Sequence, residues 1–290
     1  MELRVLRYFL EVAREENITA AAESMHITQP TLSKQLMDLE DELGKKLFIR
    51  GKRRITLTED GMLLRKRASE IIELVEKTET ELQKNDELVV GDVYIGAAET
   101  DGIKLIAKIC KNSQNKYPNI HYHLFSGNSE DVLEKLDKGL IDFAILFEPS
   151  DFKKYNYIKL PVYNNWGLLM KKDNPLAKLE YIKPKDLLNI PLIFSKQALD
   201  NNELTGWFGY NVEKLNIVAT YNLIYNASFF VEENFGSALT LDNLVNNPNL
   251  CFKPLAPNLK SNLVMAWKKY QVFSKASQIF LDELQKDLKI

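Results

Sequence analysis

Cysteine and histidine are scarce in this sequence, which limits the chemistry it can perform. The 290 residues include two cysteines, Cys110 and Cys251, and three histidines. Neither cysteine stands in a CxxC or Cys/His cluster, so we expect no metal site or disulfide and two buried thiols, with a redox role as the alternative. His121 and His123 alternate on one expected strand without a metal-binding partner, and His26 lies in a turn.

Long apolar runs and catalytic motifs are also missing. The N-terminus has no apolar signal core, and no later run is long and apolar enough to span a membrane. We therefore expect a cytoplasmic protein without a membrane partner. Neither a P-loop nor a nucleophile elbow occurs, so we expect no enzyme and no cofactor.

Excess charge of either sign is absent as well. The net charge is -2, so the chain as a whole does not attract polyanions. Its length and its 45% apolar residues allow two or three packed domains. Any nucleic-acid binding must depend on local charge, and residues 43–67 supply it with nine basic side chains against two acidic ones.

Three helices are expected within the first 44 residues. Residues 3–14 and 20–25 have helical spacing, the second behind Thr19 as N-cap. Thr28 caps the third helix, and Gly44 ends it. The buried stripe of the third helix consists of Leu32, Leu36, Leu39 and Leu43.

The opposite face of the third helix carries side chains that suit DNA. A helix N-terminus directed into the major groove brings glutamine to adenine and lysine to guanine or phosphate. Pro30, Ser33 and Lys34 point away from the leucines, and Gln29 and Thr31 lie at the exposed N-terminal end. These five residues are expected to contact DNA. A small helical bundle with a solvated polar face is the alternative.

A basic hairpin follows. Residues 47–49 and 55–57 read as short strands around Gly51. Such a wing beside a recognition helix contacts phosphates, and an arginine at its tip can enter the minor groove. The wing residues expected to bind DNA are Arg50, Lys52, Arg53 and Arg54.

These motifs resemble the winged helix-turn-helix of LysR-type transcriptional regulators. The resemblance covers residues 21–23, the TQPTLSKQ segment at 28–35, residues 39–50 and residues 57–61. It implies a regulator that binds a pseudo-palindromic DNA operator as a homodimer or homotetramer. It also implies a C-terminal domain that binds a small-molecule effector, and contact with RNA polymerase if the protein is an activator.

Residues 61–87 are expected to form a linker helix, capped by Thr58 and ending near residues 84–87. Its apolar residues repeat at spacings of four and three, which is typical of a coiled coil that pairs two chains. The dimerisation residues are Leu64, Ala68, Ile71, Val75 and Leu82. A helix packed on its own domain is the alternative.

From residue 88 strands and helices alternate, which predicts parallel βαβ units and an α/β fold. The resemblance implies a two-lobe, periplasmic-binding-protein-like effector domain. The expected plan is a winged domain at 1–60, a linker helix at 61–87 and an effector domain at 88–290, with lobe I at 88–161 plus 266–290 and lobe II at 162–265.

Ligand is expected between the lobes, where strands end and helices begin. The candidate effector-binding residues are Thr100, Asn128, Ser129, Phe147, Ser195 and Asn226, of which Thr100, Asn128 and Asn226 are equally typical N-caps. Glu99 and Asp101 depart from common family patterns and disfavour a di-anionic effector. A cationic, zwitterionic or hydroxyl-rich ligand fits better, although a carboxylate could reach Lys196.

Three classes of function compete for these features. A solute-binding protein explains only the region from residue 88 onward, and an enzyme on the two-lobe fold lacks a catalytic motif. A DNA-binding transcription regulator explains both halves of the sequence.

Overall fold

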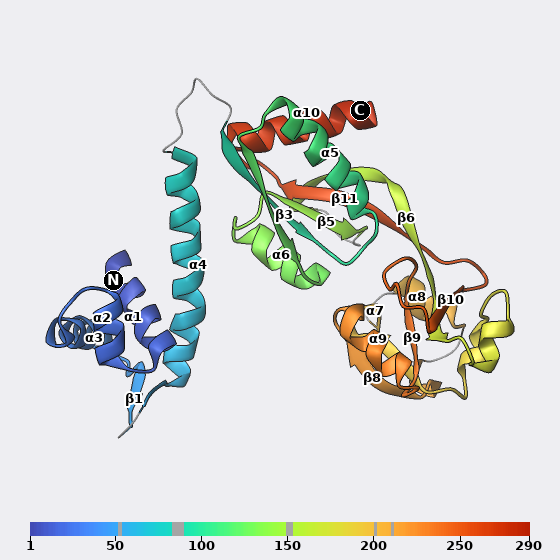
Figure 1. Cartoon of the computed structure of the whole chain (residues 1–290), viewed down its shortest axis with the longest axis horizontal. Coiled ribbons are helices and arrows are strands. Elements are labelled where there is room, and N and C mark those ends of the chain that lie inside the picture. Colours follow the sequence, from blue (N-terminus) through green and yellow to red (C-terminus); the bar gives the residue numbers. More distant parts are fainter. Residues whose placement is uncertain (52–53, 83–89, 149–152, 200–201, 210–211) are drawn as a thin grey trace. The chain divides into compact units, whose positions relative to one another are not determined.

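A computed structural model of the chain describes residues 1–51, 54–82, 90–148, 153–199, 202–209 and 212–290. The chain divides into two units, Met1–Lys84 and Asn85–Ile290, which Figure 1 shows in one view. Each unit has its own hydrophobic core. Within the described residues, no helix has both the length and the apolar character that crossing a membrane requires.

The first unit begins with the helices α1 (Leu3–Glu15), α2 (Ile18–Ser24) and α3 (Gln29–Leu43). Asn17 caps α2 in place of the predicted Thr19. Its Oδ1 accepts the backbone N–H groups of Thr19 and Ala20 at 2.8 and 3.2 Å. Because this side chain satisfies donors that a helix start leaves free, α2 begins at Ile18 and not at residue 20.

The ends of α3 agree with the prediction. Thr28 Oγ1 accepts the N–H of Thr31 at 3.4 Å, and Gly44 has the φ of 63° that ends the helix. The buried stripe consists of Leu32, Leu36 and Leu39, which share a core with Phe9. Leu43 was expected on this stripe but is 39% exposed, because the core does not extend to the last residue of the helix.

The wing consists of β1 (Phe48–Arg50) and β2 (Ile55–Leu57), which pair antiparallel with Phe48 opposite Leu57. The N–H of Gly51 donates to the carbonyl of Arg54 at 2.9 Å. The predicted hairpin is therefore present next to α3.

Helix α4 (Glu59–Leu82) follows the wing. Thr58 caps it as predicted, since its Oγ1 accepts the N–H of Gly61 at 2.9 Å. The expected end of the helix at residues 84–87 lies outside the described residues.

The apolar side of α4 packs on its own unit. Ala68 is fully buried, and Leu64 and Ile71 pack against the same core as Phe9. Three of the seam residues thus pack in or against the core of the winged domain, as in the alternative that the sequence left open, and the pairing of two chains through this helix stays a prediction. Among the other seam residues, Val75 is half-buried and Leu82 is 80% exposed.

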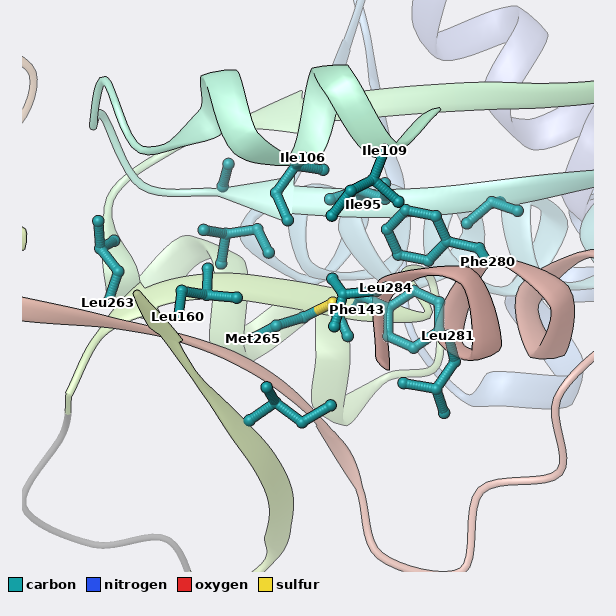
Figure 2. Close-up of a cluster of buried hydrophobic side chains, with 14 of the residues drawn as sticks. Ile95, Ile106, Ile109, Phe143, Leu160, Leu263, Met265, Phe280, Leu281 and Leu284 are labelled. Carbon is teal, nitrogen blue, oxygen red and sulfur yellow. The ribbon is translucent and has the colours of Figure 1, made fainter. Parts of the chain in front are cut away.

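The second unit contains two lobes. In lobe I, β3 (Gly91–Ala97) lies between and parallel to β4 (Ile120–Ser126) and β5 (Phe143–Phe147). Helices α5 (Ile103–Lys116) and α10 (Lys275–Leu288) cover one face of this sheet, and α6 (Ser129–Asp137) covers the other. Figure 2 shows the core on the first face, where the rings of Phe143 and Phe280 have centroids 5.1 Å apart.

Two long strands connect the lobes, as Figure 1 shows. They are β6 (Tyr155–Lys171) and β11 (Lys260–Lys268), and they pair antiparallel. The return crossing was predicted near residue 265, but Leu263 to Ala266 pair with β5 in lobe I. The crossing therefore falls at residues 260–262, which pair with residues 163–165 of β6 just before β11 joins β5.

Lobe II contains β7 (Leu192–Ser195), which is parallel to β8 (Ile217–Tyr221) and β9 (Ser237–Leu241). The C-terminal part of β6 pairs with β9 and with β10 (Leu250–Pro254), a strand that the sequence did not predict. The helices of this lobe are α7 (Lys196–Leu199), α8 (Asn202–Trp207) and α9 (Ile224–Glu232), with 3-10 turns at Pro175–Lys178, Pro184–Leu187 and Val212–Lys214.

Candidate functional site

The N-terminal turn of α3 presents polar side chains to solvent. Gln29, Pro30, Thr31 and Lys34 are exposed, and Ser33 is half-buried. Gln29 Nε2 donates to Ser33 Oγ at 2.8 Å, so these two side chains form one polar group on the exposed face. The structure thus brings together the five residues that the sequence predicted to face DNA.

The wing adds positive charge. Arg54 has a side chain that is 76% exposed, and its Nη1 lies 3.4 Å from a carboxylate oxygen of Glu16. An exposed ion pair of this kind is weak, so Arg54 remains able to exchange its partner for a phosphate. Lys52, Arg53 and the side chain of Arg50 lie outside the part of the chain that the structure describes.

A buried carboxylate joins α3 to the wing, and the sequence analysis missed it. Glu40 is 6% exposed. Its Oε1 accepts the N–H groups of Leu47 and Phe48 at 2.7 and 3.3 Å, and its Oε2 lies 2.9 Å from Lys46 Nζ. Burial raises the pKa of Glu40, but these hydrogen bonds and the charge of Lys46 outweigh it and hold the pKa below its usual range.

A cavity of about 400 Å³ lies between the two lobes of the second unit. Its apolar lining comes from both lobes and includes Phe147, Trp166, Tyr221, Ile224, Leu241 and Leu244. Its polar lining includes Glu99, Asn128, Ser129, Ser195 and Gln197. A pocket with apolar walls and a few polar groups is the usual form of a small-molecule site.

Four of the six predicted effector residues line this cavity: Asn128, Ser129, Phe147 and Ser195. Asn128 is also the N-cap of α6, since its Oδ1 accepts the N–H of Asp131 at 2.9 Å. Asn226 is within α9 and outside the cavity lining.

Thr100 is also outside the lining, because it belongs to a buried network at the crossing between the lobes. Its hydroxyl donates to Asn164 Oδ1 at 2.6 Å. Asn164 Nδ2 in turn donates to the carboxylates of Asp101 and Asp242 at 3.0 and 2.9 Å. Asp101 therefore faces this network, which joins lobe I, β6 and the end of β9.

Two further contacts join the lobes at the cavity. Glu99 Oε2 accepts the N–H of Ile224, the first residue of α9, at 2.7 Å. The amide of Gln197 lies 3.0 Å from Asn128 Oδ1, at the start of α6. Each lobe therefore places a side chain at the N-terminus of a helix in the other lobe.

No cysteine or histidine belongs to the described lining of the cavity. Both cysteines were expected to be buried, but both are half-buried. Burial raises the pKa of the Cys110 thiol to about 12, which disfavours the thiolate that redox chemistry needs. Among the described residues, no three His, Cys, Asp or Glu side chains are grouped so that they could hold a metal ion.

Two family profiles match the chain. Residues 3–62 match the bacterial regulatory helix-turn-helix protein, lysR family, and residues 86–289 match the LysR substrate binding domain. The chain belongs to the LysR family. It is a DNA-binding transcriptional regulator with a substrate-binding domain and not an enzyme, as the sequence predicted.

Curated relatives of this LysR-family chain include regulators from two organisms. It is 29% identical over 283 residues to the Hca operon transcriptional activator HcaR of Escherichia coli (strain K12), covering 93% of this chain and 92% of HcaR. It is 37% identical over 146 residues to the HTH-type transcriptional regulator BsdA of Bacillus subtilis (strain 168), and this match spans 50% of each protein.

Solved structures of LysR-family regulators share the fold. Full-length CbnR complexed with its target DNA superposes with a TM-score of 0.77 at 18% identity and covers 99% of both chains. HinK from Pseudomonas aeruginosa superposes with a TM-score of 0.56 at 21% identity, covering 100% of this chain and 99% of HinK. The winged helix-turn-helix, the long helix and the two-lobe domain are thus the family's architecture.

Proposed function

We propose that this regulator recognises duplex DNA through the N-terminal turn of α3 and that a small molecule in the cavity of the second unit changes this recognition. The observation that carries the proposal is the polar group at the N-terminal end of α3, where Gln29, Thr31 and Lys34 are exposed and Ser33 is half-buried. Side chains at the N-terminal end of a recognition helix reach base edges in the major groove. The likeness of fold to CbnR, which was solved with its target DNA, supports this role.

The wing supplies phosphate contacts in this proposal. Arg54 is exposed and only weakly paired, and the sequence places Arg50, Lys52 and Arg53 in the same hairpin. Contacts to phosphate fix the position of a protein on DNA without reading its sequence. Pro30 completes the proposed surface by holding the first turn of α3 in helical geometry.

The proposed functions follow the expected domains. Residues 1–60 bind DNA, residues 61–87 pair two chains, and residues 88–290 bind the small-molecule effector. Asn128, Ser129, Phe147 and Ser195 are the proposed ligand contacts, because they line the cavity. Because its proposed target is an operator in DNA, the regulator is proposed to act in the cytoplasm. If it is an activator, it is also proposed to contact RNA polymerase.

Two chains are proposed to pair through α4. Leu64, Ala68 and Ile71 already pack in or against the core of the first unit, so the proposed pairing surface is a neighbouring side of the helix. Leu63 and Leu74 are 58% and 41% exposed there. They are eleven positions apart, which places them within about 20° of each other around the helix.

The sensing domains are proposed to pair separately and complete a homotetramer. Helix α9 and the turn after it expose a group of aromatic side chains, Tyr225, Phe229, Phe230 and Phe235, each at least 47% exposed. Groups of exposed apolar side chains are typical of contact surfaces. A pair of winged domains at a fixed separation suits a pseudo-palindromic operator.

Ligand and DNA must then influence each other's binding. A coupling free energy of about 1–3 kcal/mol is typical, and it changes both affinities by the same factor. The test is a thermal-shift screen of metabolites on the whole chain, followed by mobility shifts on DNA from upstream of its gene. A metabolite that stabilises the chain and changes the DNA complex supports the proposal. DNA binding that no stabilising metabolite alters contradicts it.

A further inference from the structure

The charge of the cavity points to one class of ligand. Two carboxylates, Glu99 and Glu130, line it, and its described lining contains no lysine, arginine or histidine. Lys196, which the sequence offered as a partner for a ligand carboxylate, is exposed and outside the lining. The described lining therefore offers no side-chain cation to an anionic ligand.

A backbone donor that would suit an anion is already occupied at the start of α9. The N–H of Ile224 begins α9, and a helix N-terminus favours negative charge. Glu99 fills this position from the other lobe, at 2.7 Å. A ligand carboxylate would have to displace the protein's own carboxylate and lie beside it, and two like charges at close range repel each other.

Glu99 itself has room for a positive partner. Its Oε2 binds Ile224, while Oε1 has no hydrogen-bond partner among the described residues. Burial raises the pKa of Glu99, although the hydrogen bond from Ile224 opposes the shift. A ligand ammonium group would give this half-buried carboxylate a positively charged partner, which the described lining of the cavity does not provide.

The walls of the cavity suit the rest of such a ligand. Tyr221 directs its hydroxyl to the carbonyl of Leu239 at 2.7 Å, and Trp166 Nε1 donates to Ser261 at 2.8 Å. Their polar atoms are thus satisfied, and together with Phe147 they offer aromatic surface. Aromatic faces attract both apolar groups and cations.

We infer that the cavity binds an organic cation, a primary amine on an apolar ring-containing body, whose ammonium group pairs with Glu99. This inference rests on the proposed function, since it names the ligand class of the same cavity. It also narrows the three ligand classes that the sequence left open to one.

The experiment compares amines, alcohols and carboxylates on shared carbon skeletons, with tryptamine, tryptophol and indole-3-acetate as one set and phenyl and cyclohexyl analogues as the others. Calorimetry measures their binding to the whole chain, to Glu99→Gln and to Glu134→Gln. Glu134→Gln is the control, because it removes an equal charge from an exposed position on α6 that is not in the cavity lining.

At least one amine should bind the natural chain about tenfold or more tightly than its matching carboxylate. Glu99→Gln should remove most of this preference, and Glu134→Gln should retain it. Tighter binding of the carboxylates, a preference that survives Glu99→Gln, or failure of every amine to bind would each overturn the inference. The proposed function is tested separately, by whether bound ligands change the DNA complex, so the two failures are distinguishable.

Discussion

Glu40 on α3 accepts the backbone N–H of Leu47, the residue before the wing, in a buried hydrogen bond of 2.7 Å. The same carboxylate reaches Lys46 and Phe48. These bonds hold α3 and the wing in one geometry, so the base contacts proposed for α3 and the phosphate contacts proposed for the wing would be made together.

Glu40→Gln should weaken the attachment of the wing to α3 without preventing the wing from folding. Glutamine retains an acceptor but loses the charge, and hydrogen bonds to charged groups are stronger by about 1–2 kcal/mol. Hydrogen exchange at the Leu47 amide should accelerate roughly five- to thirtyfold. Asp41→Asn, an exposed change on the same helix, should have little effect. Equal exchange in the natural chain and Glu40→Gln would show that the carboxylate does not stabilise the wing.

The effect of Glu40 should depend on pH. Because its folded pKa lies below the ordinary value of 4.5, its stabilisation is complete above that value and is lost as the pH falls through the folded pKa. The ratio of Leu47 exchange rates between Glu40→Gln and the natural chain should therefore be constant near neutral pH and approach one in acid. A ratio that grows in acid would contradict this assignment.

The pair formed by Arg54 and Glu16 should limit the affinity for DNA. Arg54→Ala should weaken binding to all sequences and lower the slope of log affinity against log salt by about 0.9. Glu16→Gln should strengthen binding, because it frees Arg54 for phosphate. Glu15→Gln is the charge-matched control, since Glu15 pairs with Arg14. If Glu16→Gln and Glu15→Gln raise the affinity for DNA equally, the gain is a general effect of charge and the Arg54–Glu16 pair does not limit binding.

Pairing through α4 is testable without unfolding the first unit. Lysine at position 71 would disturb the core that Ile71 contacts, so Leu63→Lys combined with Leu74→Lys is the sharper change. This double variant should lower the mass measured by light scattering, because it places charge in the apolar contact. Met62→Lys changes an exposed residue about 100° away and should not. An unchanged mass in the double variant would remove this face from the interface.

Local signals in the sequence predicted much of the first unit. Thr28 and Gly44 mark the ends of α3 by their side-chain and backbone chemistry, which depends on near neighbours alone. The α4 seam shows the limit of such signals. Spacings of four and three demand a buried stripe, but they do not say whether the partner is another chain or, as for Ala68, the same domain.

The cavity was only partly predictable for a similar reason. Phe147 and Ser195 stand at the ends of recognisable strands, and the rule that ligands bind at strand ends found them. Thr100 also follows a strand end, but its hydroxyl donates to Asn164 and does not face the cavity. Asn164 is 64 positions away, on a strand between the lobes that the sequence pattern did not predict. The contact between Glu99 and Ile224 likewise depends on how the lobes meet, so no spacing indicates it.

The central claim is that α3 gives this regulator its sequence preference, and competition binding tests it most directly. A labelled duplex from upstream of the gene is bound at fixed salt and competed with an unrelated duplex. The natural chain should prefer its own site by about 10³ or more, and Gln29→Ala should reduce this preference by roughly tenfold or more while its binding to unrelated DNA stays unchanged. A natural chain without preference, or a Gln29→Ala variant that weakens binding to both duplexes equally, would contradict the account.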